Sequence, residues 1–145
     1  MESIRLSGEH IFFRYAYPCV EDKMIQGKIS ETHYLRLKKY AETGERPPRA
    51  LLKYCFPHAF GALRDHALNS FSESPWDFDV VADYWRHNHG KIGECRVRKV
   101  TVSGIMGENG VLLEEEKGAF LDLYGLSLSP GDLVYVHRRV IIEKA

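Results

Sequence analysis

Apolar positions recur with helical spacing through the first two thirds of the chain. Residues 30–42 predict a helix, because Tyr34 and Leu37 fall on one stripe and charged positions lie opposite. Ser30 stands where a helix N-cap is expected, and Gly44 follows the last helical position. The segment therefore carries both the sequence signals that begin a helix and those that end one.

Other helical patterns lie on both sides of this segment. The aromatic-rich stretch 10–18 favours a short helix or a strand that stops at Pro18. Ser74 and Pro75 favour the start of a further helix, with Ser74 as N-cap and proline in the first turn. The segments with helical patterns are residues 49–56, 58–69 and 75–87. The last of them is expected to bury Trp76, Val80 or Val81, Tyr84 and Trp85.

The pattern changes after Gly93, where β-branched residues and alternation replace the helical spacing. Short β-rich runs cover residues 95–103, 110–114, 119–124 and 132–143, and turn residues separate them. Four or five short strands with such turns are typical of a compact barrel. We therefore expect an α+β chain. Its parts would be a mostly helical domain over residues 1–92 and a small antiparallel β-barrel domain, OB or SH3-like, over residues 93–145.

Composition argues against several classes of protein. Twenty Lys and Arg balance twenty Asp and Glu, so nothing favours binding to nucleic acid, whose phosphates demand an excess of positive charge. The sequence has neither an apolar stretch of the roughly 20 residues that a membrane-spanning helix needs nor a signal-peptide pattern. Three cysteines, an odd number, argue against a disulfide framework. We therefore expect free thiols and a cytoplasmic protein.

Catalytic motifs are also missing from the sequence. It contains no nucleophile elbow, phosphate-binding loop, dinucleotide fingerprint or His-Glu-x-x-His motif. We therefore expect a protein that is not an enzyme.

The end of the chain carries the most informative motif. Residues 129–137 read Ser-Pro-Gly-Asp-Leu-Val-Tyr-Val-His, and an apolar run then leads to Glu143 and Lys144. Cys95 opens the first β-rich run, and residues 107–113 read Gly-Glu-Asn-Gly-Val-Leu-Leu. Together these motifs resemble the HypC/HupF family of hydrogenase maturation chaperones. Members of that family are small β-barrel proteins with a cysteine at the start of the first strand.

The resemblance implies a non-enzymatic accessory or assembly protein. Its partner would be the large subunit of a hydrogenase or another maturation factor, and the helical domain would add contacts to that partner. In the family the cysteine and the histidine are implicated in holding an iron centre in transit. The matching residues here are Cys95 and His137, and thiolate and imidazole are suitable ligands for such iron. The cofactor that the resemblance suggests is iron, held only transiently.

Two alternatives stay open. The first is a protein-interaction module of unknown partner, in which Cys95 and His137 are ordinary buried residues. The second is a zinc-stapled structural protein, because Cys and neutral His are the usual zinc ligands. The candidate zinc ligands are Cys55, His58, His87, His89 and Cys95. The sequence leaves the partner and the oligomeric state open.

Basic side chains on the β-rich runs form a candidate partner-binding surface. Arg96, Arg98 and Lys99 belong to the first run, and Arg138 and Arg139 to the last. If these runs are adjacent, the side chains lie on one face, where they could dock an acidic protein surface. The alternative is that they form the solvated side of an alternating strand.

Overall fold

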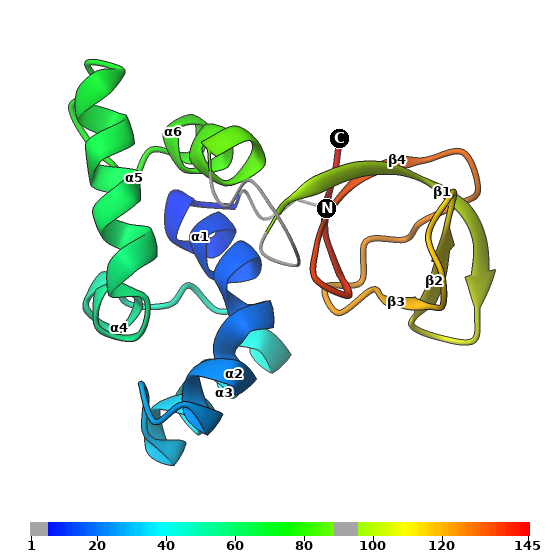
Figure 1. Cartoon of the computed structure of the whole chain (residues 1–145), viewed down its shortest axis with the longest axis horizontal. Helices are drawn as coiled ribbons and strands as arrows, with labels where there is room; N and C mark the ends of the chain where they lie inside the picture. The colour runs from blue at the N-terminus through cyan, green and yellow to red at the C-terminus, as the bar shows by residue number, and fades with distance from the viewer. Residues whose placement is uncertain (1–5, 89–95) are drawn as a thin grey trace. The chain divides into compact units, whose positions relative to one another are not determined.

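The chain has two compact units, Met1–His89 and Gly90–Ala145. The computed structural model describes residues 6–88 and 96–145. In the described residues the first unit is helical and the second is a sheet (Figure 1). The expected α+β class is therefore confirmed.

The helical unit consists of short helices joined by tight turns. It begins with α1 (Gly8–Ala16), a 3-10 turn (Tyr17–Cys19) and α2 (Val20–Ile25). It continues with α3 (Glu31–Thr43), α4 (Arg49–Cys55) and α5 (Pro57–Asn69). It ends with α6 (Phe78–Asp83) and the π-helical turn η2 (Tyr84–Asn88). Of the two possibilities for the stretch 10–18, the helix is therefore correct.

Helix α3 has the boundaries that its sequence signals predict. The Ser30 hydroxyl accepts a hydrogen bond from the backbone N–H of His33 at 3.2 Å, which satisfies one of the unpaired donors of the first turn. At the other end Gly44 adopts the left-handed conformation with φ +73°, which glycine enters without strain. Among its apolar residues only Leu37 is buried.

Helix α6 begins later than the sequence predicts. The N-cap is Asp77 and the first helical residue is Phe78, so the expected start at Ser74 and Pro75 was wrong. The reason is local, because the Ser74 hydroxyl accepts from the backbone N–H of Trp76 at 3.2 Å and closes a turn instead. The expected burial is confirmed for Trp76, Val81, Tyr84 and Trp85.

Phe12 lies at the centre of the aromatic core of this unit. Its ring centroid is 5.4 Å from that of Trp76, 5.5 Å from Trp85 and 6.2 Å from Phe56. These inclined contacts join α1 to the segments before α5 and around α6. Gly8 adds a backbone contact, since a Cβ at this position would overlap the Trp76 carbonyl oxygen.

Within residues 96–145 the sheet unit has five strands. They are β1 (Arg98–Met106), β2 (Gly110–Leu113), β3 (Phe120–Leu121), β4 (Leu133–His137) and β5 (Val140–Lys144). Neighbours pair in the order β1-β2-β3-β5-β4, and β4 pairs back with β1, so the sheet closes on itself. Its interior is packed with the buried side chains Val102, Val111, Leu113, Phe120, Val134, Val136 and Ile141.

The sheet is not wholly antiparallel, which corrects the sequence-based expectation. Strands β3 and β5 pair in parallel, with Leu121 opposite Val140, and the remaining strand pairs are antiparallel. The cause is the number of strands. In a closed ring of five, directions cannot alternate all the way round, so one neighbouring pair must run the same way.

The predicted run 132–143 is interrupted by a two-residue turn and supplies two strands. His137 and Val140 face each other across Arg138 and Arg139, and Arg138 has φ +55°. Two-residue hairpins need a positive φ at their first central residue. An arginine at that position gives no sequence signal for a turn, because glycine and asparagine are the residues usually found there.

Candidate functional site

His137 lies at the end of β4 and has no exposed surface. It occupies the place that the resemblance assigned to one ligand of a metal pair. The other expected ligand, Cys95, lies outside the described residues, so the geometry of the pair stays a prediction. A fully buried ring can coordinate a metal that is itself enclosed, but it offers no surface for passing a metal to another protein.

The described members of the proposed zinc set do not form a metal site together. Cys55 is buried at the end of α4, whereas His58 and His87 are exposed. Within residues 6–88 and 96–145, no three His, Cys, Asp or Glu side chains gather closely enough to hold a metal ion. The remaining members, His89 and Cys95, lie outside the described residues. Burial raises the pKa of the Cys55 thiol, with Arg36 and Lys23 acting in the opposite direction, so this cysteine tends to stay protonated.

Two of the candidate partner-binding arginines meet at one aromatic ring inside the sheet unit. The Arg139 guanidinium lies 4.0 Å and that of Arg98 5.9 Å from the centroid of Phe120. Arg98 also forms an ion pair with Glu116, with Nε and Oε1 2.8 Å apart. Because both side chains are held by their own fold, neither is a freely solvated charge. Arg96 is exposed and Arg138 is half-buried in the hairpin turn.

A row of basic and apolar side chains follows helix α5; all are exposed except Phe60, which is half-buried, and the sequence-based reasoning did not single the row out. Lys53 of α4 lies over the Phe60 ring, with Nζ 4.9 Å from the centroid. Phe60, Arg64 and Leu68 then follow at four-residue intervals, which places them on one side of α5. Phe71 lies just beyond the end of the helix. We call these five residues the α5 strip.

Phe71 has an unusual conformation and almost complete exposure. Phe71 follows the C-cap Ser70 and has φ +56°. The residue is 96% exposed. The Phe71 and Ser72 N–H groups donate to the carbonyls of Leu68 and Ala67 at 3.1 and 2.9 Å. This is the Schellman arrangement, in which the left-handed residue is usually glycine. Leu68, one turn earlier, is 66% exposed.

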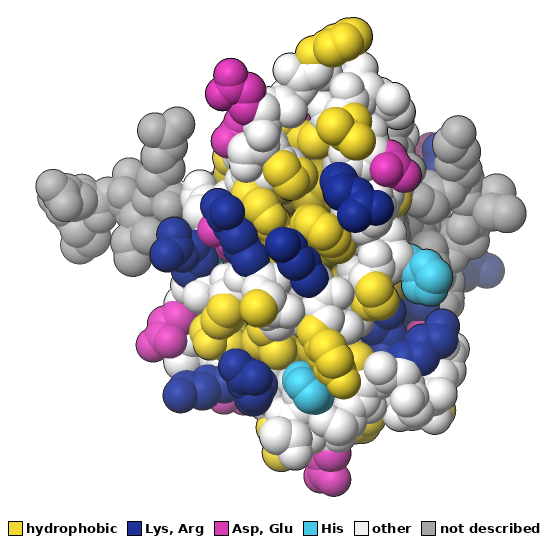
Figure 2. All heavy atoms as spheres, turned by 90° about the vertical axis from the view of Figure 1, so that its left-hand side faces the viewer, with side chains coloured by type: hydrophobic (Ala, Val, Ile, Leu, Met, Phe, Trp, Pro, Cys, Tyr) yellow, Lys and Arg dark blue, Asp and Glu magenta, His cyan; other side chains and the backbone are white. Residues whose placement is uncertain are grey.

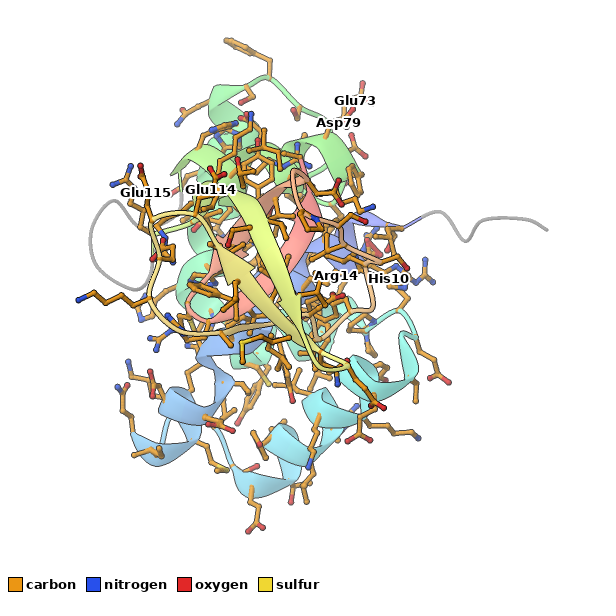
Figure 3. All side chains as sticks on the ribbon, turned by 90° about the vertical axis from the view of Figure 1, so that its right-hand side faces the viewer. His10, Arg14, Glu73, Asp79, Glu114 and Glu115 are labelled. Carbon is orange, nitrogen blue, oxygen red and sulfur yellow. The ribbon has the colours of Figure 1, made fainter. Side chains whose placement is uncertain are left out.

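Charges are distributed unevenly along the helical unit. Between residues 36 and 64 the sequence has seven Lys or Arg and two Glu, whereas between residues 65 and 83 it has five Asp or Glu and no Lys or Arg. Figure 2 shows Lys and Arg side chains crossing the hydrophobic surface of one face of the molecule. Glu73 and Asp79, from the acidic segment, point outward in Figure 3. The helical unit therefore has no net charge, but its basic and acidic residues lie in separate segments.

A shallow hollow lies beside the acidic segment. Its described lining consists of Leu6, Asp77, Phe78, Asp79 and Val80. The lining combines two carboxylates with apolar side chains. A carboxylate can act as a general acid or base, and both of these belong to exposed residues.

Comparison with protein-family models, with curated proteins and with solved structures finds no match for this chain. In the part of the chain that the structure describes, no helix has both the length and the apolar character needed to cross a membrane.

Proposed function

We propose that this protein is a non-enzymatic accessory protein that binds another protein through the helical unit. The observation that carries the proposal is Phe71. A left-handed conformation costs a bulky L-residue roughly 1–2 kcal/mol, and burying a phenylalanine normally returns about 1.5–3 kcal/mol. At 96% exposure Phe71 obtains almost none of that burial. Its side chain thus adds little to its own fold in return for the conformational cost, and exposed Leu68 lies one turn earlier, so we infer that Phe71 is a binding anchor.

The proposal is tested by placing a photo-cross-linking amino acid at position 71 in the cells that make the protein. We expect a discrete covalent product, whose second protein is identified by mass spectrometry and then shown to bind the purified chain directly. The control carries the same amino acid at Ile25, an exposed apolar residue of α2. A pattern of products that is the same from both positions, or no product from position 71, contradicts the proposal.

A second candidate is the assembly role suggested by the resemblance to the HypC/HupF family. It is favoured by one observation, which is that residues 131–137 supply the turn and strand β4 of a small closed sheet. On this reading the sheet is an OB or SH3-like barrel, the partner is a hydrogenase large subunit or a maturation factor, and Cys95 and His137 hold iron in transit. Cys19 and Cys55 form no disulfide bond, which suits a cytoplasmic location.

Metal analysis separates the second candidate from the first. The assembly role predicts iron in protein purified without oxygen, and loss of that iron in both Cys95→Ala and His137→Gln. The zinc alternative predicts one zinc per chain that is lost in Cys55→Ala. Protein that contains neither metal, yet still yields the position-71 product, leaves the interaction module as the function.

A further inference from the structure

The α5 strip combines basic and apolar side chains in one row. Lys53 touches Phe60, and Phe60 stacks on Trp76 with ring centroids 5.5 Å apart and planes inclined by 19°. The Arg49 guanidinium lies over the other end of this group, 5.6 Å from the Trp76 centroid. Basic groups therefore border the aromatic beginning of the strip. Arg64 follows in its middle, and Leu68 and Phe71 form an apolar end.

The strip is long enough for a helix of another protein. From Phe60 to Phe71 it spans about 16 Å at 1.5 Å per residue, or about three helical turns. Gly61 lies beside Arg64 on the same side of α5, and a Cβ at this glycine would meet nothing within 4 Å. Open space beside the strip lets a partner backbone come close. Glycine inside a helix also lowers its stability, and no neighbour in the described part of the chain comes close enough to Gly61 to require it.

We propose that the α5 strip docks an acidic amphipathic helix of a partner protein. This inference rests on the proposed function and names the chemistry of the partner. The apolar stripe of that helix covers Phe60, Leu68 and Phe71, because these side chains are the apolar members of the strip. Its carboxylates face Lys53 and Arg64. An amphipathic helix usually binds through apolar side chains at positions i, i+3, i+4 and i+7 of its own sequence.

The charge of the strip favours an acidic helix over other partners. The two charged members of the strip, Lys53 and Arg64, are both basic and exposed, so a basic or neutral helix lacks electrostatic complementarity with it. An anionic membrane would also be attracted to these charges. An interfacial helix, however, binds a membrane through a broad apolar face bordered by many Lys and Arg, whereas the strip has three apolar and two basic side chains. A second copy of the chain could bring its own acidic segment to the strip, and the experiment separates that outcome.

The test is selection from a random library of displayed peptides of about 16 residues, with the full chain as bait. We expect the selected peptides to combine Asp or Glu with Leu, Phe or Trp at helical spacing. Their affinity, measured by fluorescence anisotropy, should fall at least about tenfold between roughly 50 and 500 mM NaCl, because screening weakens exposed charge pairs. It should also fall about tenfold or more in Phe71→Gly and in Arg64→Glu.

Two substitutions serve as matched controls. Ile25→Ser removes an apolar residue of similar exposure from α2, and Lys38→Glu reverses an exposed charge on α3. Both should leave peptide affinity within about twofold, a change well below the loss expected of an anchor residue. Phe71→Gly is expected to fold normally, because glycine favours the left-handed conformation at this position. Loss of binding in this variant therefore reports the side chain rather than unfolding.

Each other outcome overturns the proposal in a recognisable way. Phe71-dependent peptides without acidic residues disprove the acidic partner but leave the proposed accessory function standing. Binding to vesicles of phosphatidylcholine with one quarter phosphatidylglycerol, without peptide binding, assigns the strip to a membrane. A dimer in sedimentation that disappears in Phe71→Gly assigns it to a second copy. Failure of the proposed function is separate, because it is measured by cross-linking from position 71 in cells.

Discussion

The guanidinium of Arg139 lies 4.0 Å from the centroid of the Phe120 ring. One of its nitrogens, Nη2, also donates to the carbonyls of Lys117 and Ala119 at 2.8 and 2.9 Å. Gly118 permits this approach, since a Cβ there would come within 2.7 Å of the same nitrogen. One side chain of the β4–β5 turn therefore holds the loop that leads into β3.

Removing this contact should loosen the sheet. We expect Arg139→Ala to destabilise the sheet unit by about 1–2 kcal/mol, from the lost hydrogen bonds and the lost cation–π contact. Arg139→Lys should lose about half of that, because an ammonium lacks the planar fork of donors. Hydrogen exchange of amides 110–121 measures the effect, and Arg96→Ala is the control. Equal exchange rates in Arg139→Ala and the wild type would show that the Arg139 contact does not hold this loop.

Two glycines of the helical unit should respond oppositely to a methyl group. Gly8→Ala is expected to destabilise by about 2–3 kcal/mol, because the added carbon overlaps a backbone carbonyl that cannot rotate away. Gly61→Ala should stabilise by about 1 kcal/mol, since its Cβ meets nothing within 4 Å in the middle of α5. Both tryptophans belong to this unit, so urea unfolding followed by Trp fluorescence reports both changes. Equal effects of the two substitutions would refute the packing described here.

A neighbouring pair of glutamates tests the backbone of the loop after β2. Glu114 and Glu115 are both exposed (Figure 3), but only Glu115 has a positive φ, +63°. Glu115→Gly should stabilise the sheet unit by about 0.5–1 kcal/mol, because relief of the left-handed strain exceeds the entropy that glycine adds to the unfolded chain. Glu114→Gly should destabilise it by about 0.5 kcal/mol. Circular dichroism during urea unfolding measures both, and a gain from Glu114→Gly as large as that from Glu115→Gly would contradict the conformational argument.

His10 should make the stability of the helical unit depend on pH. Its Nδ1 accepts from the backbone N–H of Ser7 at 3.1 Å and completes a capping box at the start of α1. Burial lowers the pKa of His10 below its ordinary value of 6.5, and a hydrogen bond to the Gly44 backbone opposes this. Arg14, one turn along α1 (Figure 3), and Arg46 lower the pKa further. The neutral ring is thus favoured by folding. Its contribution is complete above pH 6.5 and is lost as the pH falls through the folded-state pKa.

The variant His10→Gln isolates this effect. Glutamine can reach back to the Ser7 N–H but does not titrate. We expect the Tm of the wild type to fall more steeply than that of His10→Gln as the pH is lowered from 7.5 to 5, and the two curves to run parallel above pH 7. Any pH dependence that does not involve residue 10 cancels in the difference between the two proteins. Parallel curves over the whole range would remove His10 as the source.

Helix boundaries could be predicted where local signals agree and could not where they compete. Ser30 and Gly44 frame α3 because no other cap lies close by. Before α6, the Ser74 hydroxyl accepts from the Trp76 N–H and closes a turn, so the helix begins only after Asp77. The same hydroxyl can serve a helix cap or a turn, and the local sequence does not distinguish the two.

The candidate sites depended on contacts that no local pattern contains. Arg98 and Arg139 were expected on a common basic face, but their meeting at Phe120 requires the closure of the sheet, which brings distant strands together. The helical pattern of residues 58–69 was evident, yet which side stays uncovered is decided by the packing of the other helices. One signal was available: the helix ends in Ser-Phe-Ser, where a glycine would be expected.

The odd number of strands also leaves one weak pairing in the closed sheet. Strand β3 contributes only Phe120 and Leu121, and its single parallel register with β5 pairs Leu121 with Val140. When the ring opens by heat or denaturant, it should part there first, and the unpaired backbone edges of β3 and β5 then face solvent. Such edges recruit strands from other molecules. Mild destabilisation of the Arg139 contact should therefore appear as aggregation before it appears as unfolding.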